Sequence, residues 1–160
     1  MLGLGDGLAI YLNDHLAGAT AGANLARRAA GNNRSTPYGD TLAEIAEEIE
    51  EDRDALLDVM ERLSVREDPV KVAVGWGVEK ASRFKPNGGL GYTPLSRLEE
   101  LEALMLGVTG KLGLWQALRR THGTDPRLSG ADLQALAARA RSQRRRLERL
   151  RDRAAREALA

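Results

Sequence analysis

Apolar residues recur at spacings of three and four along most of this chain, which places them on one face of an α-helix. The stripes cover about residues 7–30, 41–63, 94–121 and 130–158, and clusters of Gly, Pro, Asn and Asp separate them. The clearest stripe consists of Leu98, Leu101, Met105, Val108, Leu112, Trp115 and Leu118. The pattern therefore predicts four long helices.

Local signals mark several helix ends. Thr93 followed by Pro94 is typical of an N-cap with proline in the first helical position. Ser129 and Asp132 have the spacing of a capping box and predict the start of the last helix. His122, just before a glycine, is expected to be a residue of a helix C-terminus, not a catalytic group.

The segment 70–85 has an ambiguous period. Its valines alternate with other residues as in a strand, but they also fit one face of a helix. A single strand would have no partner in a chain that is otherwise helical, so a short helix is favoured.

The composition limits the number of domains and the kinds of functional site that the chain can have. The chain has 160 residues, of which 42% are hydrophobic and 29% charged, which indicates one globular domain over residues 1–160. It has no cysteine and only two histidines, which excludes thiolate metal sites, cysteine nucleophiles and polyhistidine metal centres. No stretch is long and apolar enough for a membrane span, and a cytoplasmic location is expected.

The net charge of +1 conceals two opposed segments. Residues 40–63 hold ten acidic and two basic residues, a net of −8, whereas residues 129–160 hold nine Arg and four acids, a net of +5. Because opposite charges favour adjacent helices and like charges repel, these two helices are expected to lie side by side for part of their length.

Glycines occur inside two of the predicted helices. Gly18 and Gly22 lie one turn apart in the first, and Gly107, Gly110 and Gly113 follow each other at intervals of three in the fourth segment. An interior glycine destabilises a helix by roughly 0.5–1 kcal/mol relative to alanine, so a compensating gain is expected. Close approach of two helices is the favoured explanation, and space for a ligand is the alternative.

Polar residues on apolar stripes are the candidates for a binding site. His15, Asp52 and Gln143 interrupt such stripes, and Glu48 and Glu102 are carboxylates at helical spacing nearby. His15, Glu48, Asp52 and Glu102 are thus the candidate ligands for a metal or a small molecule. The simpler interpretation, in which Asp52 and the acidic run are solvated, is preferred.

The last predicted helix has the strongest local bias in composition, an excess of arginine. Its candidate basic surface consists of Arg141, Arg144, Arg145 and Arg149. Arginine suits phosphate, so nucleic-acid binding is one hypothesis. Interspersed acids, near-neutral total charge and a lack of aromatic residues favour a protein contact instead. No nucleophile elbow or phosphate-binding glycine loop is present, so no enzyme activity is indicated and no cofactor is expected.

Two segments resemble the first helical hairpin of the ferritin-like superfamily: Tyr11-Leu-Asn-Asp-His-Leu-Ala-Gly18 and Ile45-Ala-Glu-Glu-Ile-Glu-Glu-Asp52. The long connection before Pro94 is similar to the crossover of that superfamily. The resemblance implies an all-α, four-helix up-and-down bundle of ferritin-like topology, with a short extra helix in the crossover. The chain has no Glu-x-x-His sequence, as in bacterial members that lack the di-iron ligands, so iron oxidation is not carried over.

Three functional hypotheses follow. The first is a non-enzymatic bundle that acts by protein association, as a homo-oligomer. The second is a metal or small-ligand binder that uses His15, Asp52 and nearby carboxylates in the core. The third is nucleic-acid binding through the Arg-rich last helix.

Overall fold

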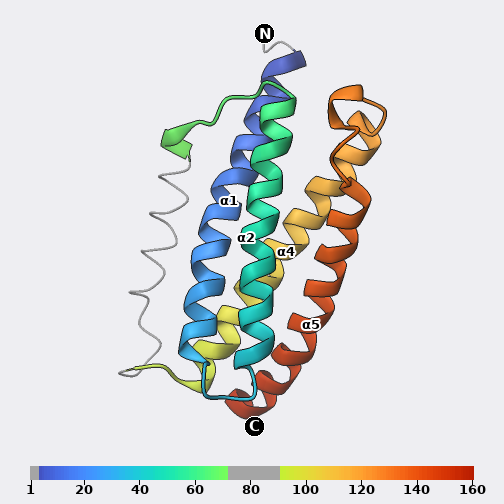
Figure 1. Cartoon of the computed structure of the whole chain (residues 1–160). Helices are drawn as coiled ribbons and strands as arrows, with labels where there is room; N and C mark the ends of the chain where they lie inside the picture. Colours follow the sequence, from blue (N-terminus) through green and yellow to red (C-terminus); the bar gives the residue numbers. More distant parts are fainter. Residues whose placement is uncertain (1–3, 72–90) are drawn as a thin grey trace.

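The computed structural model describes residues 4–71 and 91–160, and the described chain is helical without any strand (Figure 1). Its long helices are α1 (Leu4–Asn32), α2 (Gly39–Arg62), α4 (Pro94–His122) and α5 (Leu133–Leu159). A short 3₁₀ helix, η1 (Pro126–Leu128), precedes α5. The expectation of an all-α protein is confirmed.

The caps show why two of the helices begin where they do. Thr93 accepts a hydrogen bond from the backbone N–H of Ser96, whose side chain accepts from the Thr93 N–H, so the predicted N-cap of α4 is confirmed. Asp132 caps α5 by accepting from Ala135 N at 2.9 Å. The capping role predicted for Ser129 is wrong, because Ser129 ends η1 instead and α5 begins three residues later than expected.

The other boundaries lie close to those predicted, although α1 extends from residue 4 to 32 where 7–30 was expected. His122 is the last residue of α4, as expected, and joins Arg119 and Arg120 in its final turn. The short helix predicted for 70–85 lies outside the described residues, apart from its first two positions, which are helical.

The directions of the helices follow from contacts at their ends. Arg97 at the start of α4 donates from Nε to Asn33 Oδ1 at 2.6 Å, just after the end of α1. Helix α4 therefore runs antiparallel to α1 and in the same direction as α2 (Figure 1). Strict up-and-down alternation is thus not what the structure shows, since the connection from 63 to 93 returns the chain to the end at which α2 began.

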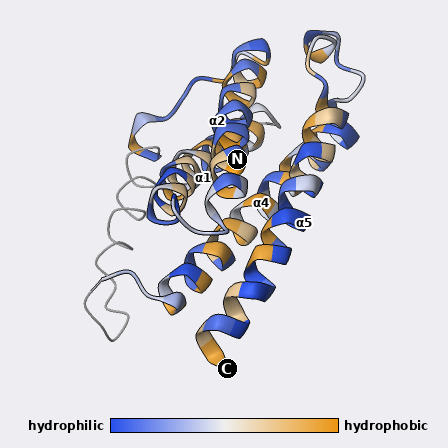
Figure 2. Ribbon diagram, turned by 60° about the horizontal axis from the view of Figure 1, so that its bottom comes forward, coloured by the Kyte–Doolittle hydropathy of each residue, from blue (hydrophilic) through white to orange (hydrophobic). Residues whose placement is uncertain are grey.

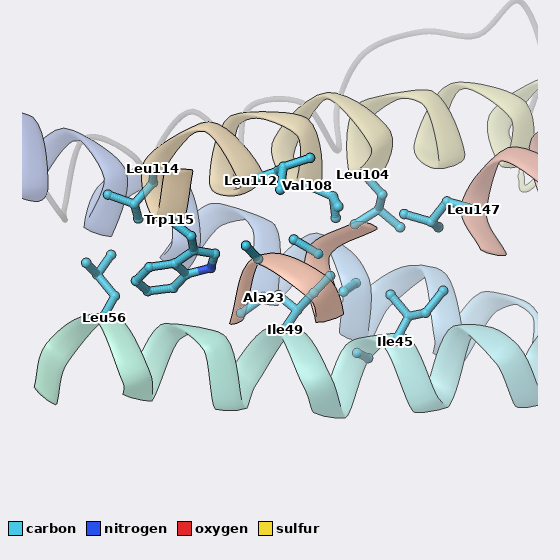
Figure 3. Packing of buried hydrophobic residues seen from close by; sticks show 14 of the residues in the cluster. Ala23, Ile45, Ile49, Leu56, Leu104, Val108, Leu112, Leu114, Trp115 and Leu147 are labelled. Carbon is cyan, nitrogen blue, oxygen red and sulfur yellow. The ribbon is translucent and has the colours of Figure 1, made fainter. Parts of the chain in front are cut away.

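The helices pack as two close hairpins, α1 with α2 and α4 with α5, and α1 also packs against α4. Helices α2 and α5 have few close backbone contacts and approach each other through side chains. All four contribute apolar side chains to one core, with α5 turning its polar side outward (Figures 2 and 3). None of the helices described combines the length and apolar character needed to cross a membrane.

A buried asparagine fastens the chain that leaves α2. Asn13 of α1 is only 5% exposed, and its Nδ2 donates to Arg66 O at 2.9 Å. Its Oδ1 accepts from the backbone N–H of Asp68 at 2.6 Å. The amide therefore uses both its donor and its acceptor to hold residues 66–68 against the first helix.

Candidate functional site

A cavity of about 220 Å³ lies between α1, α2 and α4, and part of its wall lies at the surface, where Gly18, Gly107 and Gly110 are exposed. Its wall on α1 includes Gly18 and Gly22, and its wall on α4 includes Gly107 and Gly110. Most of the remaining lining is apolar, with Ile49 and Leu56 of α2 among the buried residues. We call this space the glycine cavity.

Among the described helices the glycines mark no close contact, which corrects the favoured expectation. A Cβ atom added at Gly18, Gly22, Gly107, Gly110 or Gly113 would meet no atom of residues 4–71 and 91–160 within 4 Å. A close helix contact would put backbone or side-chain atoms within that distance. The four glycines of the cavity instead leave space that any larger side chain would reduce, which supports the alternative of room for a ligand.

Asp52 occupies one side of this space and is buried, so the preferred expectation of a solvated side chain is wrong. Its side chain is only 1% exposed, and Lys111 of α4 donates to Oδ2. Arg139 of α5 donates from Nε to Oδ1 at 2.8 Å, and Gln143 Nε2 donates to Oδ2 at 3.0 Å. Two cations and an amide thus replace the water that burial removes from this carboxylate.

Gln143 connects this arrangement to a second carboxylate. Its Nε2 lies 3.1 Å from Glu48 Oε2, and its Oε1 accepts from Lys111 Nζ at 2.6 Å. Arg146 binds the same Glu48 oxygen at 2.5 Å. We call Glu48, Asp52, Lys111, Arg139, Gln143 and Arg146 the Asp52 network.

These contacts join α2 to α5, so the predicted adjacency of the acidic and basic helices is confirmed. Arg139 also pairs with Glu51 at 2.7 Å, and Arg146 with Glu44 at 3.8 Å. The arginines that face α2 are therefore neutralised within the chain.

His15 shares the glycine cavity with Asp52, but the two do not form a hydrogen bond in the described structure. Its ring packs edge-on against Tyr11, with ring centroids 4.6 Å apart. Burial lowers the pKa of His15 below its usual 6.5, while neighbouring Asp14 opposes the shift. The imidazole is consequently neutral at pH 7.

The fourth candidate ligand lies elsewhere. Glu102 is 47% exposed and bonds Arg151 of α5 at 3.2 Å. In the described ranges, 4–71 and 91–160, no three carboxylate or imidazole groups are placed to hold a metal ion. The Lys111 ammonium beside Asp52 would also repel a cation, so the geometry supports an organic ligand better than a metal.

Trp115 gives the cavity an unusual polar group. Its side chain is fully buried, yet its indole Nε1 has no hydrogen-bond partner in the described chain. A buried donor without a partner costs about 1–3 kcal/mol, so it needs an explanation. The tryptophan was identified from sequence as a core residue, but nothing in the sequence indicates that its N–H lacks a partner.

The four arginines of the candidate basic surface lie on α5. Arg144, Arg145 and Arg149 are exposed, Arg141 is half-buried, and none of them forms an ion pair within the described part of the chain. Arg141 lines a shallow polar recess together with Gln116, Arg119 and Arg120 of α4. The outer side of α5 thus differs from its inner side, where the arginines are paired.

Comparisons with models of protein families, with curated proteins and with solved structures find no match to this chain.

Proposed function

We propose that this protein binds a small, uncharged and largely apolar molecule in the glycine cavity. The observation that carries the proposal is the cavity of about 220 Å³, with glycines of two helices in its walls. Each of these glycines destabilises its helix, and none is required by a close contact with another described residue. Retaining the space for a ligand accounts for that cost.

The charges around the cavity indicate an uncharged ligand. Asp52 is balanced by Lys111 within the lining, and Asp14 pairs with Lys71 at 2.8 Å. Arg53 is turned to Thr20 Oγ1, to which it donates at 3.0 Å. The lining thus holds two carboxylates, Asp14 and Asp52, and two cations, Arg53 and Lys111. With His15 neutral, these formal charges sum to zero, which favours an uncharged ligand.

The size of the cavity limits the size of the ligand. An apolar cavity of about 150 Å³ can hold benzene, so about 220 Å³ corresponds to a molecule roughly half as large again. Naphthalene is a suitable probe because it is uncharged, apolar and of about this size.

A pair of leucine substitutions on α4 tests the proposal. Gly107→Leu places a side chain into the cavity, whereas Gly113→Leu adds the same side chain on the same helix at a position that does not line it. We expect calorimetry to show naphthalene binding to the wild type and to Gly113→Leu, and at least tenfold weaker binding to Gly107→Leu. Equal affinities in all three proteins, or no binding to the wild type, would refute the proposal.

The helix directions support a ferritin-like arrangement as the fold in which this site lies. Parallel α2 and α4, joined by a long connection, are what a crossover between two helical hairpins requires. In this proposal the cavity takes the central place where di-iron members hold their metal. The test is a crystal structure of the whole chain, in which the four long helices would have to keep these directions.

A second candidate function is association with another protein, including a second copy of this chain, through the outer side of α5. The observation that favours it is the run of exposed arginines Arg144, Arg145 and Arg149, which form no ion pair with any residue of the described ranges. We expect sedimentation to show an assembly that dissociates as salt increases. A strict monomer that copurifies with nothing would count against association, and retention of nucleic acid in a low-salt mobility assay would favour the nucleic-acid hypothesis instead.

A further inference from the structure

The indole of Trp115 lies where a ligand in the glycine cavity could reach it. Trp115 belongs to the lining of the cavity, and Figure 3 shows the nitrogen-bearing edge of its ring directed into the core toward Ala23 and Ile49. Ile49 also lines the cavity. The donor therefore points into the molecule, away from solvent.

No protein group accepts this hydrogen bond in the described chain. The residues drawn around the ring, Leu56, Leu114 and Ile49, have side chains without an acceptor. A molecule that enters the cavity can supply the acceptor that this donor lacks, and buried polar groups are normally paired.

We propose that the ligand of the glycine cavity carries an uncharged hydrogen-bond acceptor, such as a carbonyl, ether or ring-nitrogen atom, which receives the N–H of Trp115. The inference rests on the proposed function and adds the chemical class of the ligand. The apolar frame fills the space beside the glycines, and the single acceptor fixes the orientation of the frame against α4. Trp115 is thus the residue that determines specificity.

Two isosteric probes separate the acceptor from the apolar frame. Naphthalene and quinoline have the same shape, but quinoline replaces one C–H by a ring nitrogen that accepts a hydrogen bond and is uncharged at neutral pH. An acceptor without a donor in the pocket loses its hydrogen bond to water and binds more weakly. With the Trp115 donor in place, quinoline should bind at least as tightly as naphthalene.

The variant Trp115→Phe removes the N–H while keeping an aromatic ring at that position. We expect the affinity for quinoline to fall by about three- to tenfold more than the affinity for naphthalene. Because both probes experience the same change in cavity shape, naphthalene corrects for the smaller ring. An equal loss for both probes overturns the inference, since a water molecule or nothing would then satisfy the indole.

A second measurement follows the wild-type protein, and the variant serves only to assign its indole signal. In a ¹H–¹⁵N spectrum, the indole signal that disappears in Trp115→Phe belongs to Trp115, and quinoline should shift it downfield far more than naphthalene does. Equal shifts overturn the inference but leave the proposed function intact. If neither probe binds the wild type, the proposed function itself fails, so the two failures can be told apart.

Discussion

The ammonium group of Lys111 on α4 donates a hydrogen bond to the carboxylate of Asp52 on α2, across 59 positions of sequence. Burial lowers the pKa of Lys111, and the charge of Asp52 opposes that shift. The pair is nearly inaccessible, with 13% of the lysine and 1% of the aspartate side chain exposed. Removing either charge therefore leaves the other buried without its counter-ion.

Replacing Asp52 by asparagine should destabilise the protein strongly. The amide keeps the size of the side chain but leaves Lys111 and Arg139 without their shared anion. We expect a loss of about 3–5 kcal/mol in the free energy of unfolding, measured by urea denaturation. The matched control is Glu51→Gln, since Glu51 also binds Arg139 but is 65% exposed, and it should cost less than about 1 kcal/mol.

The double variant Asp52→Asn/Lys111→Met tests whether the two charges act as a unit. Without the lysine, the uncompensated ammonium disappears, so the double variant should be less destabilised than the sum of the single variants. We expect a coupling of about 1–3 kcal/mol from a double-mutant cycle. Simple additivity would show that Arg139 and Gln143, not Lys111, stabilise the buried carboxylate.

His15 predicts a specific dependence of stability on pH. Its pKa in the folded protein is lowered from 6.5, so the unfolded chain binds the proton first as the pH falls. Stability should therefore decrease as the pH drops below about 6.5 and down to the folded-state pKa. Denaturation of wild type and His15→Asn over this range measures the effect, and the loss should be smaller in the variant; parallel curves would contradict it.

Alanine substitutions distinguish glycines that leave space from a glycine that a close contact requires. Gly113→Ala should stabilise the protein by about 0.5–1 kcal/mol, because the added Cβ meets nothing within 4 Å and the helix gains propensity. Gly39→Ala should destabilise it, since the Cβ would lie 2.6 Å from Asn33 O and 2.9 Å from Arg34 O. Thermal unfolding compares the two, and the same sign for both would contradict this assignment.

The helices could be predicted from the sequence because their signals are local. The stripe from Leu98 to Leu118 needs only a period of 3.6 residues, and Thr93 and Pro94 announce the start of α4 within a few positions. The relative direction of α2 and α4 is harder to predict from sequence, since it depends on the end of the molecule to which the connection between them leads.

The candidate site could be predicted only in part, because its properties depend on residues far apart in sequence. His15, Asp52 and the glycines were identified as unusual, but the cavity depends on how α1 and α4 are rotated against each other. Lys111 had no distinguishing pattern beyond its place between Val108 and Trp115 on the edge of an apolar stripe. The burial of Asp52 likewise depends on partners from two other helices, α4 and α5.

The contact between α2 and α5 makes this nearly neutral protein sensitive to ionic strength. The two hairpins are joined along that side by charged side chains, several of them partly exposed, where salt screens the attraction. The apolar packing inside each hairpin is not screened in this way. Added sodium chloride therefore weakens the α2–α5 seam selectively, whereas the packing of α1 against α4 and the shared apolar core are not screened and keep the two hairpins together.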